Sequence, residues 1–163
     1  MRVWLRACLA GLLIAATSAA CAPDVDLKKG LQIVDVSTGW YDAGIINGQT
    51  KLVPAIAFKL KNVSDQTLSV IQVNVLFKRV DNPAEWGSGF LTINGSKGLA
   101  PGATTEKFIA KSNLGYTGSD QTRQEMLQNS HFIDARAEFS AKYGSVQWAR
   151  LAEFPVTRML ITD

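Results

Sequence analysis

Apolar and polar side chains alternate with a period of two along most of the chain after residue 31. One such run places Ile71, Val73, Val75 and Phe77 between Gln72, Asn74, Leu76 and Lys78. Because successive side chains of a strand point to opposite faces of a sheet, the pattern predicts strands with one core face and one wetter face. Turn residues separate the runs, among them Pro101-Gly102 and Tyr143-Gly144-Ser145.

The alternation predicts seven strands and one further extended piece. The strands lie near residues 31–37, 52–61, 68–80, 88–93, 104–112, 132–141 and 146–151, and the extended piece covers 154–161. Thr122 and Glu125 have the spacing of a capping box, which predicts a helix of about two turns over 123–129. Seven short strands with frequent turns favour an all-β fold, an immunoglobulin-like β-sandwich over residues 31–163 with one short helix in a loop.

One segment resembles a family of bacterial envelope domains. Leu99-Ala100-Pro101-Gly102 leads into residues 104–109, after Phe58-x-Leu60-x-Asn62 and Val73-x-Val75-x-Phe77. This arrangement is similar to the Ig-like FxLYD type, although the Phe-x-Leu-Tyr-Asp motif itself is missing. The resemblance covers residues 50–112, and it implies a fold rather than a function.

The first twenty residues have the layout of a secretory signal peptide. Arg2 and Arg6 are followed by an uncharged apolar run over 7–16 and by small residues over 17–20. As a helix, the apolar run is about 15 Å long, half of the roughly 30 Å needed to cross a bilayer. We therefore expect residues 1–20 to be an export signal.

Cysteine usage points to a membrane anchor. Cys8 lies within the predicted leader, so Cys21 is the one cysteine of the mature chain. Ala19-Ala20-Cys21 resembles the bacterial lipobox, which implies lipidation of Cys21 and a membrane partner, with a tether over 21–30. The alternative is cleavage by ordinary signal peptidase, since Ser18 and Ala20 also fit its small-x-small pattern.

The charge balance excludes one class of partner. The chain has 17 basic and 14 acidic residues, a net charge of +3. Arg2 and Arg6 leave with the predicted leader and no acidic residue does, so the mature net charge is +3 − 2 = +1. No basic stripe remains, and we predict no nucleic-acid partner.

The residues needed for common catalytic and metal sites are missing. His131 is the only histidine, and Gly87-Ser88-Gly89 lacks the spacing of a G-x-S-x-G nucleophile elbow. We therefore predict no enzyme activity, no metal and no cofactor. Asn62-Val63-Ser64 matches the glycosylation pattern, which has no role in a bacterial lipoprotein.

Long connections gather at one end of the predicted sandwich. If the strands run up and down in order, connections 38–51, 81–87 and 113–131 share that end. They carry Trp40, Tyr41, Trp86 and Tyr116, which we predict to form a binding surface facing away from the membrane. The alternative is that Trp40 and Trp86 fold back and plug the sandwich. Trp148 is expected in the core or on the sheet surface.

The sequence thus predicts a non-catalytic, periplasm-facing lipoprotein that binds a protein partner or serves as an accessory module of an envelope assembly. Ala22, where inner-membrane lipoproteins have Asp, favours the outer membrane. The alternative is a periplasmic binder of a small apolar or lipid ligand, with room inside the sandwich beside Ala55, Ala57, Ala135 and Ala137. An enzyme with an unfamiliar site is the third interpretation.

Overall fold

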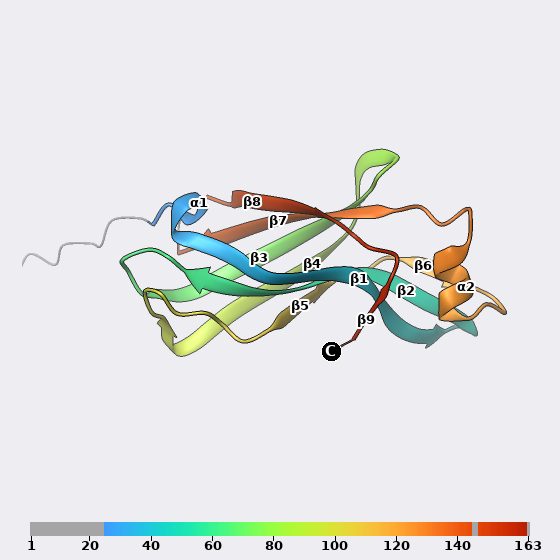
Figure 1. Ribbon diagram of the computed structural model, residues 1–163, viewed down its shortest axis with the longest axis horizontal. Coiled ribbons are helices and arrows are strands. Elements are labelled where there is room, and N and C mark those ends of the chain that lie inside the picture. The colour runs from blue at the N-terminus through green and yellow to red at the C-terminus, as the bar shows by residue number, and fades with distance from the viewer. Residues whose placement is uncertain (1–24, 145–146, 163) are drawn as a thin grey trace, which may run out of the picture.

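Two packed β-sheets make up most of the molecule. The computed structural model describes residues 25–144 and 147–162, so the predicted signal peptide at 1–20 and the predicted lipid site at Cys21 lie outside the described residues. Within those ranges the chain forms a β-sandwich-like arrangement with two short helices (Figure 1). Neither helix has the length or the apolar character needed to cross a membrane.

The elements follow one another in the order shown by the colours of Figure 1. The helices are α1 (Leu27–Gly30) and α2 (Arg123–Gln128). The strands are β1 (Leu31–Ile46), β2 (Gln49–Asn62), β3 (Leu68–Arg79), β4 (Asn82–Leu99), β5 (Phe108–Lys111), β6 (Tyr116–Gly118), β7 (Ala135–Tyr143), β8 (Ala149–Pro155) and β9 (Leu160–Ile161).

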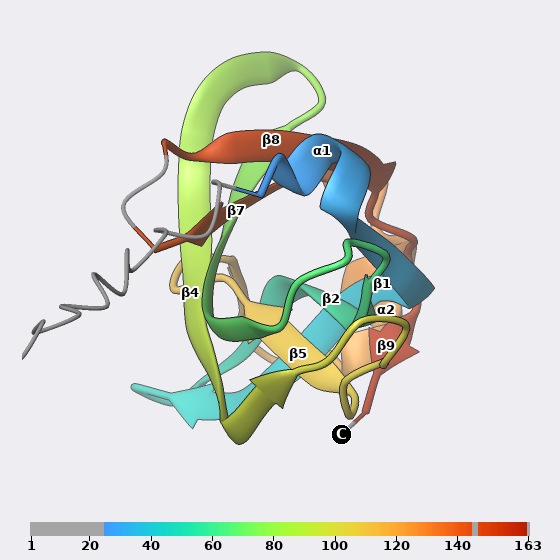
Figure 2. The same ribbon diagram turned by 90° about the vertical axis from the view of Figure 1, so that its left-hand side faces the viewer.

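Each sheet is assembled mainly from antiparallel neighbours. The first sheet has the order β5-β2-β1-β9, with β6 also paired to β2, and β9 runs parallel to β1. The second sheet has the order β4-β3-β7-β8. Seen from the end that carries α1, the two sheets lie on opposite sides of the interior (Figure 2).

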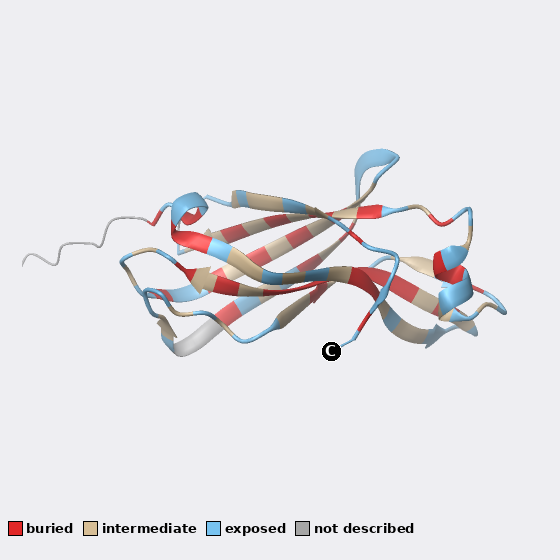
Figure 3. Cartoon of the chain, in the orientation of Figure 1, coloured by how far each residue is buried: buried red, intermediate tan, exposed pale blue. Residues whose placement is uncertain are grey.

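The predicted alternation describes the core correctly. Ile71, Val73, Val75 and Phe77 are buried along β3, and the residues between them are partly exposed, which gives the striped pattern of Figure 3. Side chains from the two sheets meet in the middle, where the rings of Phe58 and Phe139 contact edge to face with centroids 4.8 Å apart. Burial of these inward faces is what holds the sheets together.

The loop predicted at 38–51 is wrong, because this stretch is a long hairpin. β1 continues to Ile46, and β2 begins at Gln49. Asn47 and Gly48 form the two-residue turn with φ of 52° and 77°. Two residues with positive φ match the twist of the flanking strands, and Asn-Gly is the strongest short hairpin signal. That signal was present in the sequence and extends both strands by several residues.

Other predicted boundaries also change. The connection at 81–87 is part of β4, which pairs with β3 as far as Arg79 and Asn82. The connection at 113–131 contains β6 as well as α2. The strand predicted over 104–112 is shorter, since β5 covers Phe108–Lys111, and the extended piece at 154–161 is divided between β8 and β9.

The predicted helix is confirmed together with its capping box. The Thr122 hydroxyl accepts a hydrogen bond from the Glu125 N–H, and the Glu125 carboxylate accepts one from the Thr122 N–H at 2.7 Å. These hydrogen bonds to Thr122 lower the pKa of Glu125 below its usual range. Met126 and Leu127 face the core from the helix. The short helix is therefore fixed at its first turn by the cap and along one side by apolar packing.

Candidate functional site

We call the end of the sandwich that carries α2 the distal end, and the end that carries α1 the proximal end. The described chain begins at Val25 beside α1, so the N-terminal segment joins the molecule at the proximal end (Figure 1). The distal end contains the β1–β2 and β3–β4 hairpin tips, β6 and α2. It is therefore the end farthest from the tether predicted at 21–30.

Three of the predicted binding residues form an aromatic cluster packed against the core at the distal end. Trp40 is fully buried, and its ring centroid lies 5.8 Å from that of Trp86 and 6.0 Å from that of Tyr116. Phe132, which the sequence analysis did not single out, packs at 4.5 Å against both Trp40 and Tyr116. The Tyr116 hydroxyl also accepts a hydrogen bond from the Ile133 N–H. These rings plug the sandwich, and the buried Trp40 has no surface to offer a partner.

Tyr41 lies on the opposite face of the same strand. Trp40 points inward, so its neighbour Tyr41 points to the outer face of the first sheet. There the Lys111 ammonium lies 3.4 Å from the centre of the Tyr41 ring. Tyr41 packs on Ala55 and Ala57, which were expected beside a cavity inside the sandwich. That expectation is wrong for these two alanines, whereas Ala135 and Ala137 do belong to the main core.

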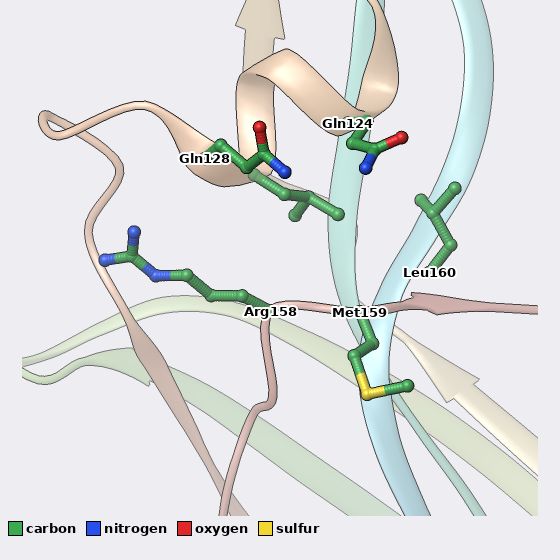
Figure 4. A pocket seen from close by; sticks show the side chains of 6 residues that line it. Gln124, Gln128, Arg158, Met159 and Leu160 are labelled. Atoms are coloured by element: carbon green, nitrogen blue, oxygen red, sulfur yellow. The ribbon is translucent and has the colours of Figure 1, made fainter.

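A groove runs along the distal end beside the aromatic plug. Its volume is about 570 Å³, and Gln124, Leu127 and Gln128 of α2 form one wall. The segment from Arg158 to Leu160 forms the other wall (Figure 4). The Met159 carbonyl accepts a hydrogen bond from the Trp40 N–H at 2.8 Å, which fastens this segment to the plug below it. The groove is therefore a surface feature built on a rigid floor.

Charged pairs hold the walls of the groove in place. The Arg158 guanidinium donates to the Asp134 carboxylate at 2.6 Å and to the Phe132 carbonyl at 2.8 Å. The hydrogen bond with Asp134 raises the pKa of Arg158. Arg123 at the start of α2 donates to Asp42 of β1 at 2.8 Å. Desolvation raises the pKa of Asp42, but the Gly44 N–H and Arg123 lower it by more, so it lies below its usual range.

Exposed apolar side chains are concentrated at this end. Met159 is 65% exposed and Leu160 is 48% exposed. The tips of the nearby hairpins and the approach to β6 add further large apolar side chains that face solvent, namely Ile45, Ile46, Val80 and Leu114. Single exposed apolar residues are ordinary on protein surfaces, but a cluster at one end marks a candidate interaction site.

A second aromatic feature lies on the outer face of the second sheet. Phe90 of β4 and Trp148, just before β8, are 57% and 43% exposed, and their ring centroids are 6.2 Å apart. Trp148 thus lies on the sheet surface, one of the two positions expected from the sequence. The sequence analysis did not single out Phe90. The signal available for it was its place in the predicted strand at 88–93, and in the structure it pairs with Asn74.

Among the described residues, no group of three or more His, Cys, Asp or Glu side chains is placed to hold a metal ion.

Comparisons with known proteins assign no family to the chain. No protein-family model matches the chain, and no curated protein matches it in sequence. A calcium-binding mutant of Bacteroides uniformis beta-glucuronidase 2 is similar over 77% of this chain, with 17% identity and a TM-score of 0.43. This chain spans only 12% of that enzyme.

Two other solved structures give comparable scores. The Northeast Structural Genomics Consortium target SoR45 is 10% identical, with a TM-score of 0.41, over 80% of this chain and 88% of that one. An ApaA protein from Bordetella pertussis is 14% identical, with a TM-score of 0.40, over 77% and 91%. Scores this low support no conclusion about family or function. The fold itself places the chain in the class of two-sheet, β-sandwich-like proteins.

Proposed function

We propose that the protein is a non-catalytic envelope lipoprotein whose distal end binds a segment of a protein partner. In this proposal the domain is an Ig-like sandwich of the FxLYD type, anchored in the outer membrane through Cys21 and facing the periplasm. The strand order β4-β3-β7-β8 opposite β5-β2-β1 supports the Ig-like assignment, because immunoglobulin-related sandwiches divide their strands between two sheets in this way.

The observation that carries the proposal is the position of the groove. An apolar groove with exposed Met159 and Leu160 lies at the end opposite the point where the chain enters the domain. Val25 and Leu27 are buried in the core, so only residues 21–24 of the predicted tether are left to span the distance from Cys21 to the domain. Four residues reach about 14 Å at most, so the proximal end would face the membrane and the distal end the periplasm. Long connections and a groove on a rigid scaffold are where binding usually occurs.

The groove and its surroundings indicate the chemistry of the partner. Charges of both signs are interspersed at the distal end, and Asp42, Asp81 and Asp134 are each paired with an arginine of the same end. No net charge therefore selects the partner, and the exposed Met159 and Leu160 are the part of the groove left for it. A complementary partner segment carries apolar side chains for the groove.

Photo-crosslinking in cells tests the groove. We expect a photoreactive residue at position 159 to give a discrete protein adduct whose crosslinked peptide is apolar. Introducing Leu160→Lys in the same chain should reduce the adduct at least tenfold, because a charge is then placed in a groove that binds an apolar segment. The measurement is the adduct yield by immunoblotting, followed by mass spectrometry of the crosslinked peptide.

A matched control uses Phe90, which is exposed to a similar degree but lies on the outer face of the second sheet. A photoreactive residue at position 90 should give no discrete adduct, and Phe90→Lys should leave the adduct at position 159 unchanged. Equal adducts from positions 90 and 159, or a crosslinked peptide without apolar side chains, would contradict the proposal.

Metabolic labelling tests the anchor separately. Cells given radioactive palmitate should label the wild-type protein, whereas the Cys21→Ser variant should carry no label and should leave the membrane fraction. The physical reason is that several acyl chains on one cysteine supply a stable anchor, at about 0.8 kcal/mol for each buried CH₂ group. An unlabelled wild-type protein would rule out the lipoprotein assignment without affecting the groove.

A specific observation also favours the alternative function, the binding of a small apolar or lipid ligand. The two sheets part at the proximal end between β4 and β5, and an apolar cleft of about 290 Å³ opens there. This cleft is separate from the distal groove and shares no lining residue with it.

A further inference from the structure

We infer that the proximal cleft between β4 and β5 is a binding site for the single acyl chain of an anionic lipid. The cleft and the distal groove lie at opposite ends of the sandwich. The inference therefore adds a ligand to the protein and stands independently of the partner proposed for the distal groove.

The lining of the cleft is suited to a hydrocarbon. Leu68 and Ile71 of β3 and Ile93 of β4 form its floor and are buried members of the main core. Leu99 and Phe108 are partly buried and form the two lips, one from each sheet. The polar side chains that line the cleft are Thr105 and Glu106. A ligand that enters here thus contacts the hydrophobic core directly.

Size and shape restrict the class of ligand. A volume of about 290 Å³ is many times the space that a single water molecule needs, so the cleft has room for a hydrocarbon chain. The walls are the edges of two sheets that pack about 10 Å apart, so an unbranched chain fits the slot better than a fused ring system does. A ten-carbon chain is therefore a suitable probe of the cleft.

The backbone around the cleft is constrained, so neighbouring side chains do not simply close it. Gly98 on the β4 side has φ of 68°, and a Cβ atom there would lie 2.7 Å from Thr67 Cγ2. On the other side, the Thr105 hydroxyl accepts a hydrogen bond from the Leu60 N–H at 3.0 Å, which ties that lip to β2. Both lips are therefore held apart by contacts outside the cleft.

Charge at the proximal end favours an anionic head group. Lys97 precedes Gly98 on one lip, Lys107 follows Glu106 on the other, and both lysines are exposed. Basic side chains outnumber acidic ones among the described residues of this end. The basic ones are Lys28, Lys29, Lys61, Lys97 and Lys107, and the acidic ones are Asp26, Asp65 and Glu106. Each lysine near an anionic surface adds to the attraction. The described chain also begins at this end, so a tethered protein would hold the cleft near the bilayer.

Binding of decanoic acid to the Cys21→Ser chain tests the inference, because this variant has no acyl chain of its own at position 21. Native mass spectrometry should show one ligand per chain, and calorimetry should give a saturable 1:1 isotherm. Decylamine, which has the same chain and a cationic head, should bind at least fivefold more weakly. The same calorimetric titration with decanoyl-lysophosphatidylglycerol in place of decanoic acid distinguishes the two sources of the chain. Tighter binding of the lysophospholipid would indicate a phospholipid, and tighter binding of decanoic acid would indicate a free fatty acid.

A pair of matched variants locates the site. Leu99→Trp fills the mouth of the cleft and should weaken decanoic acid binding at least tenfold. Leu151→Trp places the same side chain at the opening between β1 and β8 on the other side of the sandwich, and should change binding less than twofold. Both positions are partly buried leucines, so a loss through general destabilisation would affect both variants.

The inference would be overturned by no saturable binding, by equal losses in Leu99→Trp and Leu151→Trp, or by preference for decylamine. Binding to Cys21→Ser but not to the lipidated wild-type chain would assign the cleft to the protein's own anchor, and would overturn the assignment to a separate lipid. The distal adduct at position 159 should persist in Leu99→Trp, so failure here is distinguishable from failure of the proposed partner binding.

Discussion

Replacing Trp40 with alanine should lower the free energy of unfolding by about 3 to 5 kcal/mol, the usual cost of removing a buried Trp or Phe side chain. The Trp40 ring contacts Trp86, Tyr116 and Phe132, so its loss opens a cavity in the plug at the distal end. The measurement is urea unfolding followed by far-ultraviolet circular dichroism, because tryptophan fluorescence changes with the substitution itself.

Two further variants make this expectation decisive. The Trp40 Nε1 atom is buried without a hydrogen-bond acceptor, so Trp40→Phe loses packing but also removes an unsatisfied donor, and should cost clearly less than alanine. This variant also supplies a measurement if the alanine variant does not fold. Trp148→Ala removes a tryptophan that is only partly covered and should cost less than about 1 kcal/mol. Similar losses at positions 40 and 148 would contradict the plug.

The strand pattern and the helix cap were predictable because both depend on neighbours in sequence. A period of two and a Thr122–Glu125 spacing are local signals, and each element was found where its signal lies. The hairpin at Asn47-Gly48 was predictable in the same way and was missed, since residues 38–51 were treated as a loop on account of their glycines and aromatics. A correct hairpin there places Trp40 inside a strand, where alternation decides its direction.

The arrangement of the aromatic residues was only partly predictable. The order of the connections brings Trp40, Trp86 and Tyr116 to one end, but it does not say whether they face inward or outward. That is decided by register: Trp40 pairs with Pro54 on an inward row, and Tyr41 pairs with Val53 on the outer row. A one-residue change of register would exchange the two faces.

The groove and the cleft depend on contacts between segments far apart in sequence. The distal groove needs α2 beside residues 158–160, and the proximal cleft needs Leu99 opposite Phe108 across two sheets. No local pattern encodes such a juxtaposition. The exposed pair of Phe90 and Trp148 is of the same kind, since Phe90 lies in the edge strand β4 and Trp148 in the connection that leads into the other edge strand, β8.

One buried polar side chain connects the loops at the proximal end. Asn62, the last residue of β2, is fully buried, and its amide donates to the carbonyls of Gln66 and Leu99 at 2.7 Å each. Its side-chain oxygen accepts from the Ser64 N–H and the Ser64 hydroxyl. Every hydrogen-bonding group of the side chain is thus used. Asn62-Val63-Ser64 has the glycosylation pattern, but its amide lies where no sugar can reach.

Replacing Asn62 with alanine should therefore lower the free energy of unfolding by about 3 kcal/mol. The substitution removes the side-chain partner of the Leu99 carbonyl and of the Ser64 N–H, both part-buried, whereas the Gln66 carbonyl keeps a hydrogen bond from the Ser64 hydroxyl. Each group left unsatisfied costs about 1 to 3 kcal/mol. Asn129→Ala is the matched control, because the Asn129 side chain accepts a single hydrogen bond, from the His131 N–H near the surface, and its loss should cost about 1 kcal/mol or less.

Asn62→Asp adds a test by pH, with stability measured by urea unfolding between pH 3 and pH 8. The new carboxyl group would be buried against two carbonyl oxygens, so its folded-state pKa should be raised above the unfolded value of about 3.9. The charged form is then disfavoured in the folded state, and the loss relative to wild type should grow as the pH rises above about 4 and shrink as the carboxyl group is protonated. A pH-independent difference would show that residue 62 is solvated and that the loops at the proximal end are held by other contacts.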